Sequence, residues 1–172
     1  AIRGQAMIIG FSTGNAFPLR CLDILCSALL TLPALETVEF NDIGGEGPEE
    51  AQSLESMVKL LQSPALRAVT FHSVVFPNTL FQIVSANVLK ERSQITDLHF
   101  YHCSFPEGGD AVIAGLLETN TTLKSLGFFS EGDEVFYEGW HRLFYPILRC
   151  RSLALLPLVY PRFAHICHHC SW

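Results

Sequence analysis

One short phrase recurs along the chain at nearly constant spacing. Residues 95–105 read ITDLHFYHCSF and residues 66–76 read LRAVTFHSVVF, with aliphatic and aromatic residues at matching places. The fourth and sixth positions of the phrase are apolar in every copy. The copies stand 28 to 31 residues apart, and their first residues are Ala6, Leu35, Leu66, Ile95, Leu123 and Leu153. A period of this size predicts a repeat architecture, because one such unit cannot bury its apolar face alone.

Each phrase alternates apolar and polar residues, which predicts a short strand with one buried face. The segments between the phrases carry apolar residues at helical spacing. The predicted helices span 21–32, 48–63, 77–92, 106–120 and 140–148. The stripes expected to face the core are Leu22, Leu25, Cys26 and Leu29; Leu54, Met57, Val58 and Leu61; Leu80, Ile83, Val84 and Val88; and Val112, Ile113, Leu116 and Leu117. Strands that alternate with helices predict an α/β fold with a parallel sheet.

The phrase is similar to the repeat of the leucine-rich-repeat family, ribonuclease-inhibitor-like type, which runs L-x-x-L-x-L-x-x-N/C-x-L. Cys103 stands at the N/C position and Phe105 at the last apolar one, whereas other copies depart from the pattern with Gly14, Ile43, Val74 and Glu131. The resemblance implies a horseshoe-shaped solenoid with a parallel β-sheet on the concave face and α-helices on the convex face. Residues 1–159 would form the repeat domain, of about five to six units, and residues 160–172 a C-terminal cap or tail. Because the first unit has no polar cap before it, we expect a fragment of a longer protein.

Composition narrows the classes of partner. Hydrophobic residues make up 49% of the 172 residues and charged residues 16%, which excludes a disordered chain. The net charge is -6 and no basic stripe is present, so we expect no nucleic-acid partner. The longest apolar run, residues 21–32, contains Asp23 and stops at Pro33, so we expect no membrane partner. Six scattered cysteines favour free thiols and a cytoplasmic location.

The alternation also predicts which side chains point away from the core. Positions three, five and seven should point to the concave face, where equal positions of neighbouring strands line up. The middle of this face would hold a patch of His72, His99, Tyr101 and Phe129, beside acidic Glu36, Glu39 and Asp42. The candidate partner-binding residues are Glu39, Asn41, Thr70, His72, Asp97, His99, Tyr101 and Phe129. In the first copy, the same alignment places Ala6 beside Leu35 and Ile9 beside Val38.

Aromatic residues flanked by polar ones are typical of the centres of protein interfaces. The first hypothesis is therefore a protein–protein interaction module that recognises a protein partner through the concave sheet. The family resemblance implies an alternative, a regulator of an enzyme such as a small GTPase or nuclease, for which the mid-array arginines are Arg67 and Arg92. A third reading is a plain sheet surface, where aromatic residues only fill cross-strand pairs.

Two histidine groups raise a further alternative, a metal-binding or catalytic protein. His72 and His99 could combine with His102 or Asp97, since zinc favours such ligands. The tail has C-x-x-C spacing with histidines inside it, in Cys167, His168, His169 and Cys170, but structural zinc normally needs a second ligand pair. Whether the tail binds metal stays open. Because no nucleophile elbow or Walker pattern is present, we expect no catalytic residues, no cofactor and no enzyme activity.

Overall fold

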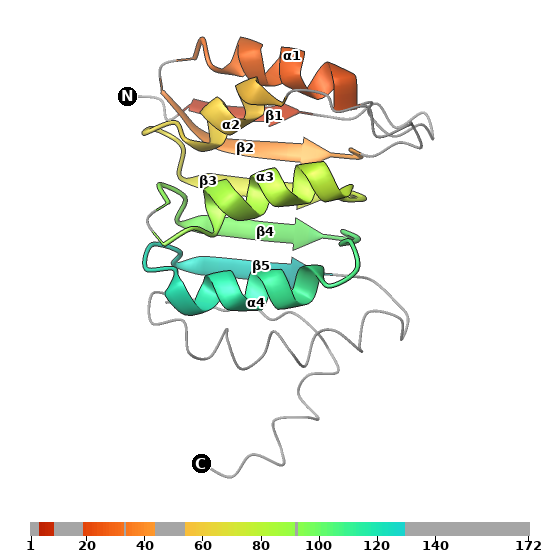
Figure 1. Cartoon of the computed structure of the whole chain (residues 1–172). Coiled ribbons are helices and arrows are strands. Elements are labelled where there is room, and N and C mark those ends of the chain that lie inside the picture. Colours follow the sequence, from red (N-terminus) through yellow and green to blue (C-terminus); the bar gives the residue numbers. More distant parts are fainter. Residues whose placement is uncertain (1–3, 9–18, 33, 44–53, 92, 130–172) are drawn as a thin grey trace.

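The computed structural model describes residues 4–8, 19–32, 34–43, 54–91 and 93–129. Within these ranges, five parallel strands form one sheet whose order follows the chain (Figure 1). The strands are β1 (Gly4–Ile8), β2 (Leu35–Asn41), β3 (Ala68–His72), β4 (Asp97–Tyr101) and β5 (Ser125–Phe129). The prediction of an α/β fold with a parallel sheet is therefore confirmed.

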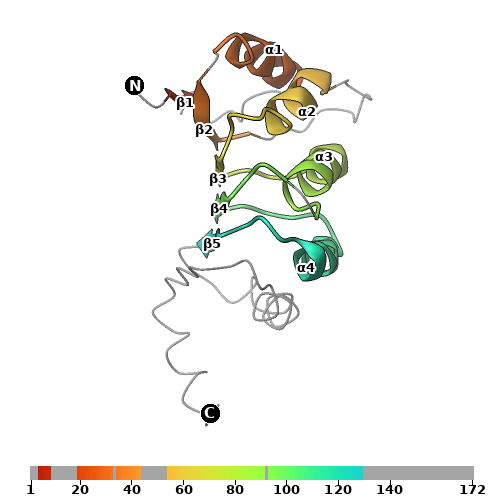
Figure 2. The same cartoon turned by 90° about the vertical axis from the view of Figure 1, so that its left-hand side faces the viewer.

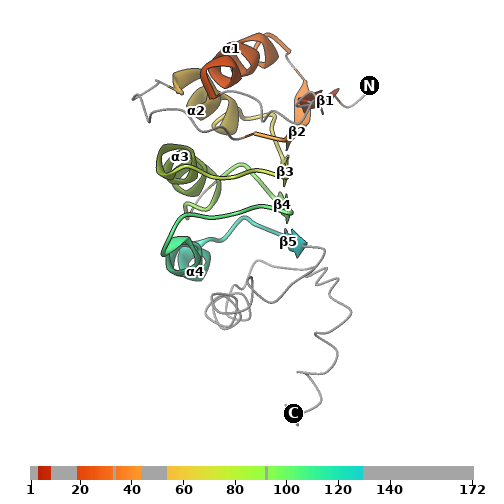
Figure 3. The same cartoon turned by 90° about the vertical axis from the view of Figure 1, so that its right-hand side faces the viewer.

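Helices alternate with the strands along the described part of the chain. They are α1 (Leu19–Leu29), α2 (Glu55–Leu61), α3 (Asn78–Val88) and α4 (Gly109–Thr119). Edge-on views from opposite sides show α1–α4 together on one side of the sheet (Figures 2 and 3). The predicted helix at 140–148, the sixth phrase and the tail at 160–172 lie outside the described residues.

The strand register confirms the predicted columns from β2 to β5. Position four aligns Val38, Val69, Leu98 and Leu126. Position seven aligns Asn41, His72, Tyr101 and Phe129. The prediction for the first copy is wrong, because Ala6 pairs with Val38 and Ile8 with Phe40 rather than Ala6 with Leu35. A shift of three residues keeps apolar residues on the core positions of β1, so the sequence pattern does not distinguish the two registers.

The core lies between the sheet and the helices. Its centre is a buried stack of four phenylalanine rings at position six, contributed by Phe40, Phe71, Phe100 and Phe128. Neighbouring rings in this stack have centroids 5.2, 5.5 and 5.2 Å apart and lie within 14° of parallel. Phe76 packs edge-on against both Phe71 and Phe100 from the side of the helices. Such contacts add to the stabilisation that burial of the rings provides.

The helix stripes are largely as predicted, with two kinds of difference. Val112 is 46% exposed, although its neighbour Ile113 is fully buried. Three buried core residues of the predicted helices lie outside the predicted stripes, namely Leu60, Phe81 and Leu89. Where two apolar residues stand side by side on a helix, spacing alone does not decide which one faces the sheet.

Strands β2, β3 and β4 are each followed by a residue with left-handed backbone geometry. The φ angles are 51° at Asp42, 52° at Ser73 and 52° at His102, all at position eight of the phrase. Their amide groups donate to the carbonyl oxygens of His72, Tyr101 and Phe129 respectively, so the ladder of backbone hydrogen bonds continues beyond the strands. A non-glycine residue at positive φ carries a steric cost, which these hydrogen bonds help to offset.

The side chain at position nine turns back into the core, as predicted for Cys103. Its Sγ lies 3.3 Å from the carbonyl oxygen of Tyr101 and 3.4 Å from that of Phe71. Ile43 and Val74 fill the same position with fully buried apolar side chains. Burial raises the pKa of the Cys103 thiol to about 11. Within the described ranges, no helix is both long and apolar enough to cross a bilayer.

Candidate functional site

The sheet face opposite α1–α4 carries three stacked aromatic rings. The imidazole of His72 lies 4.4 Å from the Tyr101 ring, centroid to centroid, at an interplanar angle of 6°. The Tyr101 ring lies 4.3 Å from that of Phe129, at 7°. We call His72, Tyr101 and Phe129 the aromatic ladder, and the sheet surface that bears them the ladder face.

The in-register pairing of β3, β4 and β5 creates this ladder. Parallel strands lie roughly 4.8 Å apart, so equal positions bring flat side chains into face-to-face contact. The three ladder side chains are half-buried, since they cover one another but no described helix covers them. In these contacts each ring fixes the rotamer of the next, which leaves a rigid, partly apolar surface.

His99 lies beside the ladder, in the column at position five. A Cβ added to Gly127, its partner on β5, would lie 2.6 Å from His99 Nδ1 and 2.5 Å from Phe129 Cε2. The imidazole therefore occupies space that only a glycine leaves free. Its centroid lies 6.3 Å from that of Tyr101 and 6.2 Å from that of Phe129.

The polar atoms of His99 have unequal surroundings. Nε2 lies 3.3 Å from the hydroxyl of Ser125, whereas Nδ1 is buried and has no hydrogen-bond partner among the described residues. Burial lowers the pKa of His99, and the nearby Asp97 carboxylate opposes part of this shift. The neutral imidazole is therefore favoured, as expected for a ring that packs between strands.

Two carboxylates lie on the ladder face, at position five of β2 and position three of β4. Glu39 pairs in register with Thr70, and Thr70 with His99, in the position-five column. Asp97 Oδ2 accepts a hydrogen bond of 2.6 Å from Thr96 Oγ1, at the start of β4. All eight candidate residues thus lie at outward positions of β2–β5: Glu39, Asn41, Thr70, His72, Asp97, His99, Tyr101 and Phe129.

Two residues of this face were placed in columns by the sequence but were not counted as candidates. Ser125 holds the imidazole of His99, and Gly127 makes room for it. The sequence contains a signal for this contact, because a glycine directly opposite a large ring on a neighbouring strand indicates that the ring lies over it.

The histidines of this face do not assemble a metal site. Among the described residues, no group of three or more His, Cys, Asp and Glu side chains is close enough to hold an ion. The combination of His72 and His99 with His102 or Asp97 is therefore not formed. The tail that contains Cys167 and Cys170 lies outside the described residues, as does Arg92.

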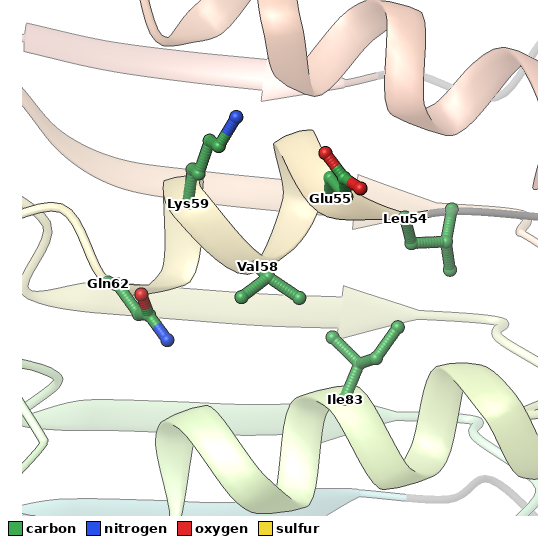
Figure 4. A pocket seen from close by; sticks show the side chains of 6 residues that line it. All are labelled: Leu54, Glu55, Val58, Lys59, Gln62 and Ile83. Carbon is green, nitrogen blue, oxygen red and sulfur yellow. The ribbon is translucent and has the colours of Figure 1, made fainter.

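A shallow groove of about 370 Å³ lies on the helix side, between α2 and α3. Figure 4 shows Val58 and Ile83 pointing toward each other across it, while Lys59 points away from Ile83. The lining is completed by Leu54, Glu55, Lys59 and Gln62. Because its polar groups do not converge on one point, the groove lacks the features of a small-molecule site.

The comparisons with known proteins show similarity to solved structures alone. No family model and no curated protein matches the chain. Among solved structures, the chain is similar to a tropomodulin C-terminal domain from Caenorhabditis elegans, with 13% sequence identity and a TM-score of 0.45. The match covers 79% of this chain and 83% of that one. A similarity at this level assigns neither a family nor a function to the chain.

Proposed function

We propose that the chain is a leucine-rich-repeat interaction module that binds a partner protein through its ladder face. In this proposal the units form a ribonuclease-inhibitor-like solenoid, with the ladder face on the concave side. The proposal rests on the repeat of 28 to 31 residues and on Cys103 at the N/C position of its phrase. One strand and one helix per unit agree with it along the described chain.

The aromatic ladder is the observation that carries the binding proposal. Partly exposed aromatic rings are favoured at the centres of protein interfaces, since each supplies a large contact area at low entropic cost. The rings of His72, Tyr101 and Phe129 already stack with centroids 4.3 to 4.4 Å apart. A partner therefore meets an ordered surface, and little side-chain freedom is lost when it binds.

Affinity capture from a lysate of the source cell tests this proposal. The bait proteins are the wild type, the ladder variant His72→Ala/Tyr101→Ala/Phe129→Ala and a matched control, Ile24→Ala/Val112→Ala. The control removes apolar side chains that are 70% and 46% exposed on the helix side. Circular dichroism establishes that all three remain folded.

We expect a protein that the wild type and the control both retain and that the folded ladder variant loses. Equal capture by the ladder variant and the wild type would contradict the proposal and leave the ladder as sheet packing alone. Loss of the partner from the control instead would move the binding surface to the helices.

A further inference from the structure

The charges of the ladder face indicate what kind of partner it accepts. The outward positions of β2–β5 carry Glu39 and Asp97 but no lysine or arginine. Asp42 follows β2 directly, next to the His72 end of the ladder. Among the described cations, Arg67 and Lys124 directly precede β3 and β5 and thus lie at the other end of the strands.

Glu39 is the carboxylate best placed to receive a charged group. It is half-buried beside Thr70, and its carboxylate makes no hydrogen bond or ion pair within the described part of the chain. Asp97, by contrast, is already held by the hydroxyl of Thr96. A half-buried carboxylate on a sheet surface is less hydrated than one in bulk water, so its attraction for a cation is stronger.

We propose that the occupant of the ladder face is a basic segment of a partner protein, with a lysine or arginine at Glu39 and an apolar side chain across the ladder. This inference rests on the proposed function and adds the chemistry of the partner. Three strand steps separate Glu39 on β2 from Phe129 on β5. Those steps span roughly 14 Å across the sheet, and the two-residue offset along the strands raises the separation to about 16 Å, which about four to five residues of an extended peptide cover.

Other occupants fit the charges less well. The phosphates of a nucleic acid would meet carboxylates with no compensating cation at the outward strand positions. An acidic segment would be repelled for the same reason. A second copy of this chain would bring together two surfaces of the same sign, in a protein of net charge -6.

A random peptide library displayed on phage is the probe. The purified 172-residue protein is used for selection. The ladder variant His72→Ala/Tyr101→Ala/Phe129→Ala is used for counter-selection, which removes peptides that bind without the ladder. We expect enriched peptides that place a lysine or arginine about four to five positions from an aromatic or large aliphatic residue. Acidic peptides should be depleted.

One enriched peptide is then synthesised for titration against three proteins. We expect Glu39→Gln to weaken binding roughly two- to fivefold, as for a partly exposed ion pair, and Glu39→Lys to weaken it further. Glu118→Gln, at an exposed position of α4, is the matched control and should bind as the wild type does. Added salt should weaken binding to the wild type more than binding to Glu39→Gln.

The outcomes separate the two proposals. Enriched peptides that need the ladder but carry no basic residue, or that are insensitive to Glu39→Lys, overturn the basic-segment inference and leave the proposed function standing. Peptides that bind the ladder variant as tightly as the wild type overturn both proposals. A library that yields no peptide dependent on the ladder also overturns both.

Discussion

Phe100 and Tyr101 are neighbours in sequence, and their rings belong to two aromatic stacks on opposite faces of one sheet. Phe100 stacks between Phe71 and Phe128 in the core, with centroid distances of 5.5 and 5.2 Å. Tyr101 stacks between His72 and Phe129 on the ladder face, at 4.4 and 4.3 Å. The same in-register pairing thus builds one stack that holds the fold together and another that faces away from the helices.

Because one stack is buried and the other is partly exposed, substitutions at two adjacent residues should lower the free energy of unfolding by unequal amounts. Phe71→Ala removes a fully buried ring and should lower the free energy of unfolding by about 3–5 kcal/mol. His72→Ala removes one half-buried ring from the ladder and should cost about 1 kcal/mol. Urea denaturation of both variants measures the difference. Equal losses would mean that the ladder is core packing rather than an available surface.

Gly127→Ala should disturb the ladder from beneath. The new Cβ would lie 2.6 Å from His99 Nδ1 and 2.5 Å from Phe129 Cε2, so both rings must move. We expect this to lower the free energy of unfolding by about 1–3 kcal/mol. In a His99→Ala background the cost should be smaller, because one of the two clashes is gone. Gly115→Ala is the control, since its Cβ meets nothing within 4 Å, and it should be neutral or mildly stabilising. A double-mutant cycle without coupling between positions 99 and 127 would contradict this geometry.

Asn120 should be the most sensitive polar side chain in the described loops. It is buried, its Nδ2 donates to the Lys90 carbonyl at 2.8 Å, and its Oδ1 accepts from the amides of Thr122 and Leu123 at 3.1 and 2.8 Å. Asn120→Ala leaves these groups without that partner, so we expect a loss of about 2–4 kcal/mol in denaturation experiments.

Thr119→Ala is the control for the Asn120 substitution. Its hydroxyl is exposed and donates only to the Leu116 carbonyl in the same helix, so its removal should change stability by less than about 0.5 kcal/mol. If the two variants lose the same stability, the hydrogen bonds of Asn120 do not bridge consecutive units in the way that the distances indicate.

The thiols of the described cysteines should differ in reactivity. Burial raises the pKa of Cys26 to about 12, with a smaller contribution from Asp23, and that of Cys103 to about 11. Cys21, by contrast, is half-buried. At neutral pH we expect iodoacetamide to label Cys21 well before Cys26 or Cys103, as measured by peptide mass mapping. Faster labelling of Cys103 than of Cys21 would contradict the buried position of its turn.

The same raised pKa values set a direction for stability at alkaline pH. The folded state holds these thiol protons more tightly than the unfolded state, in which the pKa lies near 9.0. The stabilisation that the two protonated thiols give the folded state is therefore fully present below pH 9. It is lost as the pH rises from 9 toward 11 and 12. In a Cys26→Ala/Cys103→Ala protein, the fall of unfolding free energy over this range should be smaller. An unchanged slope would contradict the assignment.

Much of the fold follows from the alternation of apolar and polar residues. Because a strand exposes every second side chain, the phrases were sufficient to align Val38 with Val69 and His72 with Tyr101. The same reasoning failed at Ala6, where a shift of three residues leaves an equally apolar pattern and the pairing with Val38 was missed. Pattern identifies a face, but register also depends on the connecting segments.

The finer features of the site depend on contacts between units, which a linear pattern does not contain. Alternation placed His99 and Gly127 in one column, but only the packed sheet brings the imidazole over the glycine. The left-handed geometry of Ser73 likewise has no signal in residue type, since serine, unlike the histidine at position 102, is not enriched at positive φ. The hydrogen bonds of neighbouring strand ends impose it.

Strand order that follows chain order also sets how such a surface can change in length. A unit duplicated after β5 would leave the four described strand pairs in place and, with an aromatic residue at position seven, would lengthen the ladder by one ring. A unit inserted between β3 and β4 would instead separate His72 from Tyr101 by an extra strand and divide the stack. The face can therefore be fitted to longer or shorter targets in steps of roughly 4.8 Å, by gain or loss of whole units rather than by substitution.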